Sequence, residues 1–119
     1  VFMSRQQEIF VWCVDTFGDG SALPDERAMR FIEEALELAQ ACGLSQEAVA
    51  RITDRVYERE PGQVFKEFGQ AGLTLEALAQ CQDVELHDAC DVEFARIIKI
   101  PKEEFAERHA AKVALGIAN

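Results

Sequence analysis

Apolar side chains recur at helical spacing along almost the whole chain, and this periodicity limits the fold more than any other feature. One helix face is clear in the first segment, where the i, i+3, i+4, i+7 pattern is filled by Phe10, Cys13, Val14 and Phe17. No stretch shows the strict alternation of apolar and polar residues that is typical of a strand. Only three prolines and seven glycines interrupt the 119 residues. The chain is therefore predicted to be all-α.

Turn-forming residues divide this pattern into helices. Residues 18–21 break the first helix, Pro24 suits the first turn of the second, and Gly43 suits its end. Ser45 is a suitable N-cap for the third helix. The predicted helices cover residues 4–17, 24–42, 45–60, 61–82, 85–99 and 101–115. Residues 1–119 are thus expected to form a single domain, an antiparallel bundle of five to six helices.

The charge balance excludes several kinds of partner. The chain has 22 acidic and 12 basic side chains and a net charge of −10, which repels the phosphates of nucleic acids. No run of residues reaches the ~20 apolar positions of a membrane span. We therefore expect a cytoplasmic protein that binds neither nucleic acid nor membrane. An acidic protein that acts on polyanions needs divalent cations, so its carboxylates are the first residues to consider.

The four cysteines lie far apart in the sequence and form no CxxC pair. They are Cys13, Cys42, Cys81 and Cys90. Each lies among apolar residues at helical spacing, so we expect buried free thiols in a reducing compartment. His87 and Cys90 form an HxxC step, but a zinc site would need a second pair at matching spacing.

Three glutamates lie close together on the second predicted helix. Glu34 and Glu37 are three residues apart and so project from nearly the same side, and Glu33 and Glu37 form an i, i+4 pair. Like charges at this spacing repel one another, and a bound cation would offset the repulsion. An apolar arc lies on the opposite side of this helix, so a solvated polar face is the alternative interpretation.

A further glutamate lies on the fourth predicted helix. Glu67 is predicted to face the core, because it falls within the arc of Val64, Ala71, Leu75, Leu78 and Cys81. A carboxylate in such a place is costly unless it is paired, protonated or bound to a metal. With Glu34 and Glu37, it offers the few oxygen ligands that Mg²⁺ prefers, in an arrangement that helical bundles use for metals.

These two helices carry motifs that resemble a known family. Glu33-Glu34-x-x-Glu37, followed later by Glu67-x-x-Gln70, is similar to the EExxE…ExxD signature of the all-α nucleoside triphosphate pyrophosphohydrolases. That superfamily includes MazG and the dimeric dUTPases. The surrounding segments W-C-V-D-T-F-G, E-R-A-M-R-F-I-E-E-A-L-E-L-A-Q-A-C-G and T-L-E-A-L-A look like a small MazG-like subfamily of phages and prophages. The resemblance covers most of the chain.

The resemblance implies an activity and a set of ligands. The expected reaction is hydrolysis of a (deoxy)nucleoside triphosphate to the monophosphate and pyrophosphate, with Mg²⁺ or Mn²⁺ as the cofactor. By matching position, Glu34, Glu37 and Glu67 are expected to bind the metal, and Glu33 or Glu37 to act as the general base. Gln70 is the expected fourth ligand, and it stands where the family usually has Asp. Its neutral amide oxygen is a weaker ligand for Mg²⁺.

The last two predicted helices supply candidate cations for the triphosphate. These residues are Arg96, Lys99, Arg108 and Lys112, and ordinary surface charge is the alternative interpretation for each. Because relatives complete the slot for the base with a second subunit, the resemblance also implies a homodimer or a larger homo-oligomer. A two-fold symmetric dimer is the default geometry.

Two other functions stay open at this point. Residues 15–26 match a calcium-binding EF-hand loop at positions one, five, six and twelve, but Phe17 occupies position three, where an oxygen ligand is needed. Ala22 and Pro24 are further departures from that loop. The other alternative is a non-catalytic helical interaction module, a relative that has kept the fold while Gln70 replaces the usual Asp.

Overall fold

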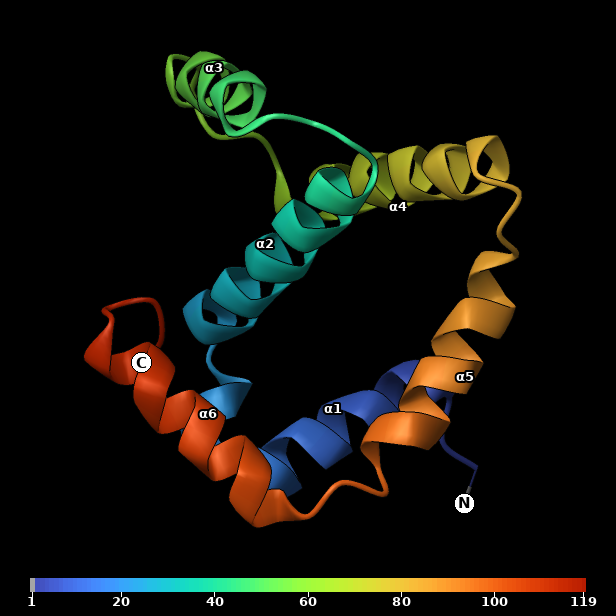
Figure 1. Ribbon diagram of the computed structural model, residues 1–119, viewed down its shortest axis with the longest axis vertical. Coiled ribbons are helices and arrows are strands. Elements are labelled where there is room, and N and C mark those ends of the chain that lie inside the picture. The colour runs from blue at the N-terminus through green and yellow to red at the C-terminus, as the bar shows by residue number, and fades with distance from the viewer. Residues whose placement is uncertain (1) are drawn as a thin grey trace. The chain divides into compact units, whose positions relative to one another are not determined.

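The computed structural model describes residues 2–119, and within them the fold is all-α, as predicted, with six α-helices, one short 3₁₀ helix and no strand (Figure 1). The elements are α1 (Arg5–Phe17), η1 (Asp19–Ala22), α2 (Pro24–Ala41), α3 (Gln46–Tyr57), α4 (Val64–Cys81), α5 (Leu86–Ile97) and α6 (Lys102–Ala114). The largest departure from the predicted boundaries lies between α3 and α4. There the loop is longer than expected, because Pro61 disfavours helical backbone at the residue before it.

Local capping explains where the first helices begin and end. Ser4 and Gln7 form a capping box at the start of α1, in which the Gln7 amide donates to the Ser4 hydroxyl at 3.2 Å. The predicted N-cap of α3 is confirmed, since the Ala48 amide donates to the Ser45 hydroxyl at 3.1 Å. Gly43 follows α2 with φ +90°, a conformation that glycine adopts without strain.

The chain divides into two compact units. The first unit contains the residues up to 41 together with residues 94–119, and so includes α1, η1, α2 and α6. The second unit, residues 42–93, contains α3 and α4. Because α5 crosses the boundary at residue 94, its last turn belongs to the first unit.

Aromatic rings join α6 to α1 in the first unit. The Trp12 ring meets the Phe105 ring edge to face at 5.3 Å between centroids, and Phe17 lies 5.7 Å from Phe105. Phe94 and His109 border the same group, at 6.5 Å from Trp12 and 5.8 Å from Phe17 respectively. Edge-to-face pairs at these separations add stabilisation beyond the burial of their area.

A buried hydroxyl fixes the passage from α1 to α2. Ser21 in η1 is buried, and its hydroxyl lies 3.1 Å from the Cys13 carbonyl oxygen and 2.7 Å from that of Gly18. Arg27 on α2 donates to the Cys13 sulfur at 3.1 Å. Burial raises the pKa of the Cys13 thiol, although the Arg27 guanidinium acts in the opposite direction.

The C-terminal residues bind the beginning of α2. The Asn119 side-chain amide donates to the Asp25 carboxylate at 2.9 Å, while the Asn119 carbonyl oxygen lies 2.8 Å from the His109 ring. Arg30 donates to the Ile117 carbonyl oxygen, and the Ala118 side chain is buried. These contacts hold the end of α6 against α2.

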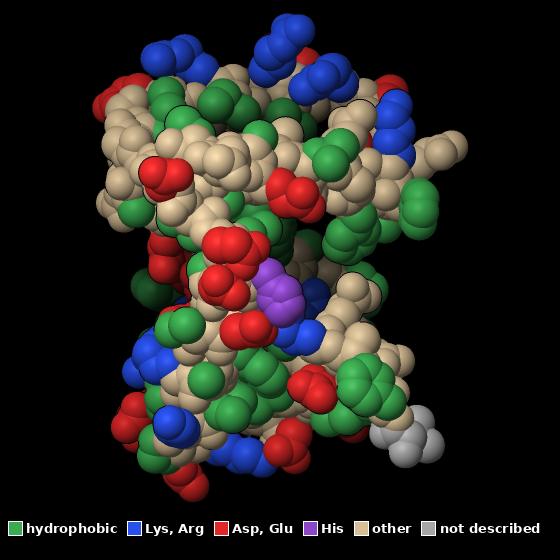
Figure 2. Space-filling view, turned by 90° about the vertical axis from the view of Figure 1, so that its right-hand side faces the viewer, with side chains coloured by type: hydrophobic (Ala, Val, Ile, Leu, Met, Phe, Trp, Pro, Cys, Tyr) green, Lys and Arg blue, Asp and Glu red, His purple; other side chains and the backbone are tan. Residues whose placement is uncertain are grey.

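The second unit leaves most of its apolar side chains in solvent. Neither α3 nor α4 contains a buried residue. Phe65 is 93% exposed and Phe68 75% exposed, and Tyr57, Val64 and Leu73 are also largely exposed. Hydrophobic side chains reach the visible surface of the molecule at many points in Figure 2.

Two sequence predictions about burial are therefore wrong. All four cysteines are free as expected, but Cys42 and Cys81 are exposed and Cys90 is only partly buried. Glu67 is exposed as well, and α4, on which it lies, contains no buried residue. Helical periodicity identified an apolar face correctly, but it does not show what covers that face.

No helix within residues 2–119 is both long enough and apolar enough to cross a membrane.

The aromatic group should dominate the stability of the first unit. We expect Phe105→Ala to lower the free energy of unfolding by about 2 kcal/mol, because the partly buried ring leaves a void against Trp12 and Phe17. Chemical denaturation followed by the fluorescence of Trp12, the single tryptophan of the chain, measures this change. Phe2→Ala is the matched control, and its exposed ring should change the stability by less than ~0.5 kcal/mol. Equal effects in the two variants would contradict the packing described for Phe105.

Candidate metal centre

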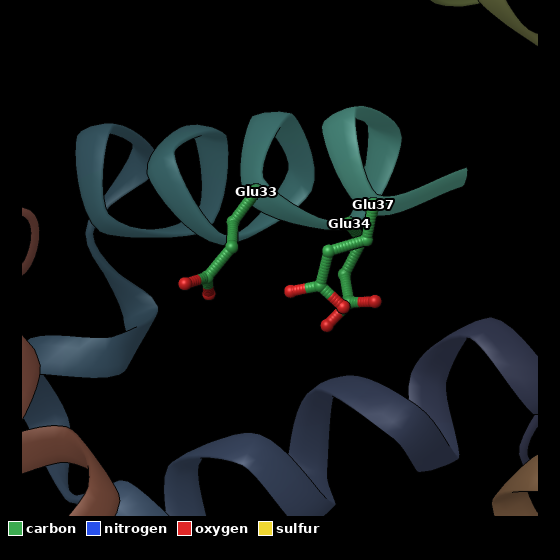
Figure 3. A group of neighbouring side chains, drawn as sticks. All are labelled: Glu33, Glu34 and Glu37. Carbon is green, nitrogen blue, oxygen red and sulfur yellow. The ribbon is translucent and has the colours of Figure 1, made fainter. Parts of the chain in front are cut away.

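One face of α2 brings three carboxylates together. Glu33, Glu34 and Glu37 each offer an oxygen atom, and these atoms all lie within 4.8 Å of one another. The side chains project to the same side of α2, toward the side on which α1 lies (Figure 3). Glu33 is partly buried, whereas Glu34 and Glu37 are exposed. We call these three residues the acidic triad.

The acidic triad concentrates negative charge at short range. Two unit charges at such a separation repel by about 1 kcal/mol in water and by more where the solvent is partly excluded. Hard oxygen ligands in this number suit Mg²⁺ or Mn²⁺, which bind a few carboxylates and keep water or phosphate oxygens as further ligands. The donor set of the acidic triad thus fits the expected cofactor.

Two cations already contact one member of the triad. Glu33 Oε1 lies 2.8 Å from Lys112 Nζ, which comes from α6, and 3.4 Å from Arg30 Nη1, one turn earlier on α2. The Lys112 contact links residues that are 79 positions apart in the sequence. Lys112 was among the residues predicted to bind phosphate, and its location beside the triad keeps that prediction open.

Arg30 was missed by the sequence analysis. It lies between Glu33 and Glu26, whose side chain is only 1% exposed and lies 3.7 Å from Arg30 Nε. That distance allows attraction between the charges but is too long for a hydrogen bond. The signal was present in the sequence, because Glu26, Arg30 and Glu33 follow the i, i+4, i+7 spacing of one helix face.

Arg108, Arg96 and Lys99 are the other predicted phosphate ligands. Arg108 pairs with Glu104 at 3.6 Å and stands over the Phe105 ring at 5.4 Å. Arg96 and Lys99 are exposed near the end of α5. Lys112 is thus a predicted cation that contacts the acidic triad.

Glu67 and Gln70 belong to the second unit, on the first two turns of α4. The Glu67 carboxylate folds back over the preceding loop, where a Cβ atom on Gly62 would approach Glu67 Oε2 to 2.9 Å. A larger residue at position 62 would require this exposed, flexible carboxylate to shift. That Glu67 and Gln70 join Glu34 and Glu37 at one metal stays a prediction.

The alternative cation sites find less support. Asp15 pairs with Lys102, whereas Glu26, twelfth in the EF-hand pattern, is buried beside Arg30. Within residues 2–119, the acidic triad is the group of three acidic, histidine or cysteine residues whose ligand atoms converge. His87 of the HxxC step instead lies 3.3 Å from Asp91.

Comparisons of the chain with protein-family models, with curated proteins and with solved structures found no match.

Neutralising one glutamate of the acidic triad should separate two effects. One is the repulsion that the charge adds to the metal-free protein, and the other is the affinity that it gives for a metal ion. We expect Glu37→Gln to raise the melting temperature of the metal-free protein by about 1 °C, because repulsion within α2 falls by a few tenths of a kcal/mol. The same variant should lose the stabilisation of about 2–3 kcal/mol that saturating Mn²⁺ gives the wild type. Thermal unfolding with and without Mn²⁺ measures both effects. Glu76→Gln, on α4, is the control and should keep the Mn²⁺ response; a Glu37→Gln protein that keeps it too would argue against the triad as the metal site.

Proposed function

We propose that the protein hydrolyses a (deoxy)nucleoside triphosphate to the monophosphate and pyrophosphate, with Mg²⁺ or Mn²⁺ as the cofactor. The observation that supports this most strongly is the acidic triad on α2, with the ammonium group of Lys112 at its edge. Carboxylates that hold a divalent cation and a lysine that pairs with anions are the two groups that a triphosphate site needs. The motif around the triad also resembles the pyrophosphohydrolase signature.

In this proposal the carboxylates have separate tasks. Glu34 and Glu37 hold the metal, with Glu67 and Gln70 of α4 as further ligands. When bound, the ion supplies positive charge that offsets the charge developing on the phosphate oxygens and makes a water molecule more acidic. Glu33 or Glu37 accepts a proton from the attacking water. The water oxygen bonds to the α-phosphorus, and the bond from this phosphorus to the bridging oxygen breaks as pyrophosphate leaves.

A non-catalytic interaction module is the second candidate. The exposed apolar side chains of α3 and α4 favour it, because surfaces of this kind bind other protein surfaces. Gln70 in place of the usual Asp is consistent with an inactive relative. Both candidates fit a cytoplasmic protein with free thiols, which is the location that we propose.

The test of function is pyrophosphate release across a panel of nucleoside and deoxynucleoside triphosphates with Mg²⁺ or Mn²⁺. We expect turnover by the wild type and a loss of at least about 100-fold in Glu34→Gln, since a metal ligand is removed while the side-chain volume is kept. Glu76→Gln should stay at the wild-type rate. Absence of turnover with every nucleotide and both metals would favour the interaction module.

Separate variants test whether residues of α4 bind the metal. Glu67→Gln should abolish turnover if this carboxylate is a ligand, and should leave stability unchanged because Glu67 is exposed. Gln70→Asp should tighten metal binding, because it restores a charged ligand. Full turnover in Glu67→Gln would remove α4 from the metal site.

We also propose that the protein self-associates, with a two-fold symmetric homodimer as the simplest form. The exposed apolar face of the second unit supports this, because a monomer would leave Phe65 and Phe68 in water. Sedimentation of the wild type at micromolar concentration should show a dimer or a larger assembly. The double change Phe65→Ser and Phe68→Ser should shift it toward the monomer, whereas Lys66→Ser on the same helix should not. A wild-type monomer at these concentrations would contradict the proposal.

A further inference from the structure

We infer that the second unit, residues 42–93, folds only when two copies of the chain associate, with α4 of one copy packing against α4 of the other. This inference rests on the proposed self-association, and it adds that folding and association are a single step for this unit. The surface concerned is one apolar face of α4, which we call the α4 stripe. Its residues are Val64, Phe68, Ala71, Leu75 and Leu78.

The first argument is that the second unit has no core of its own. None of residues 42–93 is buried, and the side chains of Val64 and Phe68 are 73% and 75% exposed. The helices α3 and α4 have 12 and 18 residues. Helices of such lengths are marginal in water unless packing offsets the entropy that is lost when they become ordered. The second unit therefore needs apolar surface from outside itself.

The second argument is the spacing of the α4 stripe. Its residues recur at alternating intervals of four and three, which is the pattern by which one helix packs along another. Leu75 and Leu78 are partly covered, whereas Val64 and Phe68 leave the start of the stripe open. Because a two-fold axis brings the same surface from both chains, a second α4 presents apolar side chains at the matching spacing.

The third argument is the amount of surface that the chain exposes, which is 9629 Å². A compact monomer of the same mass, 13.3 kDa, exposes about 6,500 Å². Obligate homodimers bury about 2,000–5,000 Å² in total, so an excess of roughly 3,000 Å² per chain is sufficient for such an interface. Proteins of this kind often have no stable folded monomer.

The first experiment measures amide hydrogen exchange in the wild type at two protein concentrations, without metal or nucleotide. Its result is therefore independent of the catalytic proposal. Between about 1 and about 100 µM, mass action should raise the protection of the α3 and α4 amides about ten- to hundredfold. The amides of α1 are the internal control, because Trp12 packs against Phe105 within one chain. Their protection should change by less than about twofold.

The second experiment removes the largest side chain of the α4 stripe. We expect Phe68→Ser to lower the protection of the α3 and α4 amides at least about tenfold at the higher concentration, because less apolar surface meets the second copy. Lys66→Ser is the matched control. Lys66 is an exposed residue of the same helix, and its position lies on nearly the opposite side from Phe68. Its protection should stay within about twofold of the wild type.

Sedimentation under the same conditions separates this inference from the proposed self-association. A dimer whose α3 and α4 protection does not change with concentration would overturn the inference and leave self-association standing. A monomer with protected α3 and α4 would overturn both, since the first unit of the same chain would then cover the stripe. An equal rise in the protection of α1 would overturn the assignment of the coupling to the second unit.

Discussion

Like-charge repulsion on one face of α2 is the constraint around which the first unit is arranged. Glu33, Glu34 and Glu37 repel one another at short range, and Glu33 receives positive charge from two directions. Arg30 supplies it from the preceding turn and Lys112 from α6. The Lys112–Glu33 pair thus joins α6 to α2 through one of the carboxylates that we propose as a metal site.

The first unit is held together by a few specific contacts and little apolar core. Aromatic rings pack α6 against α1, and the Ser21 hydroxyl of η1 donates a hydrogen bond to α1. The C-terminal residues form hydrogen bonds with the start of α2. Cys13 and Ala118 are the buried apolar residues among those that the structure describes. In the second unit, the exposed rings of Phe65 and Phe68 show that burial of apolar surface within one chain is incomplete. Self-association would bury the remaining apolar surface, and we therefore propose it together with the catalytic activity.

The sequence was sufficient for the helices and for the acidic triad, because both depend on residues close to one another in the chain. Helical periodicity and caps such as Ser45 located the elements, and the spacing of Glu33, Glu34 and Glu37 placed them on one face. Burial was harder to predict, because it depends on partners distant in the sequence. Glu67 was assigned to a core that does not cover it.

The contacts of Lys112 and Arg30 with Glu33 differ in how well the sequence could predict them. The pairing of Lys112 with Glu33 joins positions 79 residues apart, and no local pattern shows which of several cations will reach the triad. Arg30, in contrast, could have been found from its helical spacing to Glu26 and Glu33. The acidic motif contains the carboxylates alone, whereas a charge cluster is defined by residues of both signs.

The central claim is that the acidic face of α2 binds a divalent metal. A crystal structure of the full chain grown with Mn²⁺ tests it most directly, because anomalous scattering locates the ion independently of any assumed ligands. We expect an anomalous peak at bonding distance from the carboxylate oxygens of Glu34 and Glu37. A peak at other residues, or an acidic triad that binds no ion at saturating Mn²⁺, would contradict this claim.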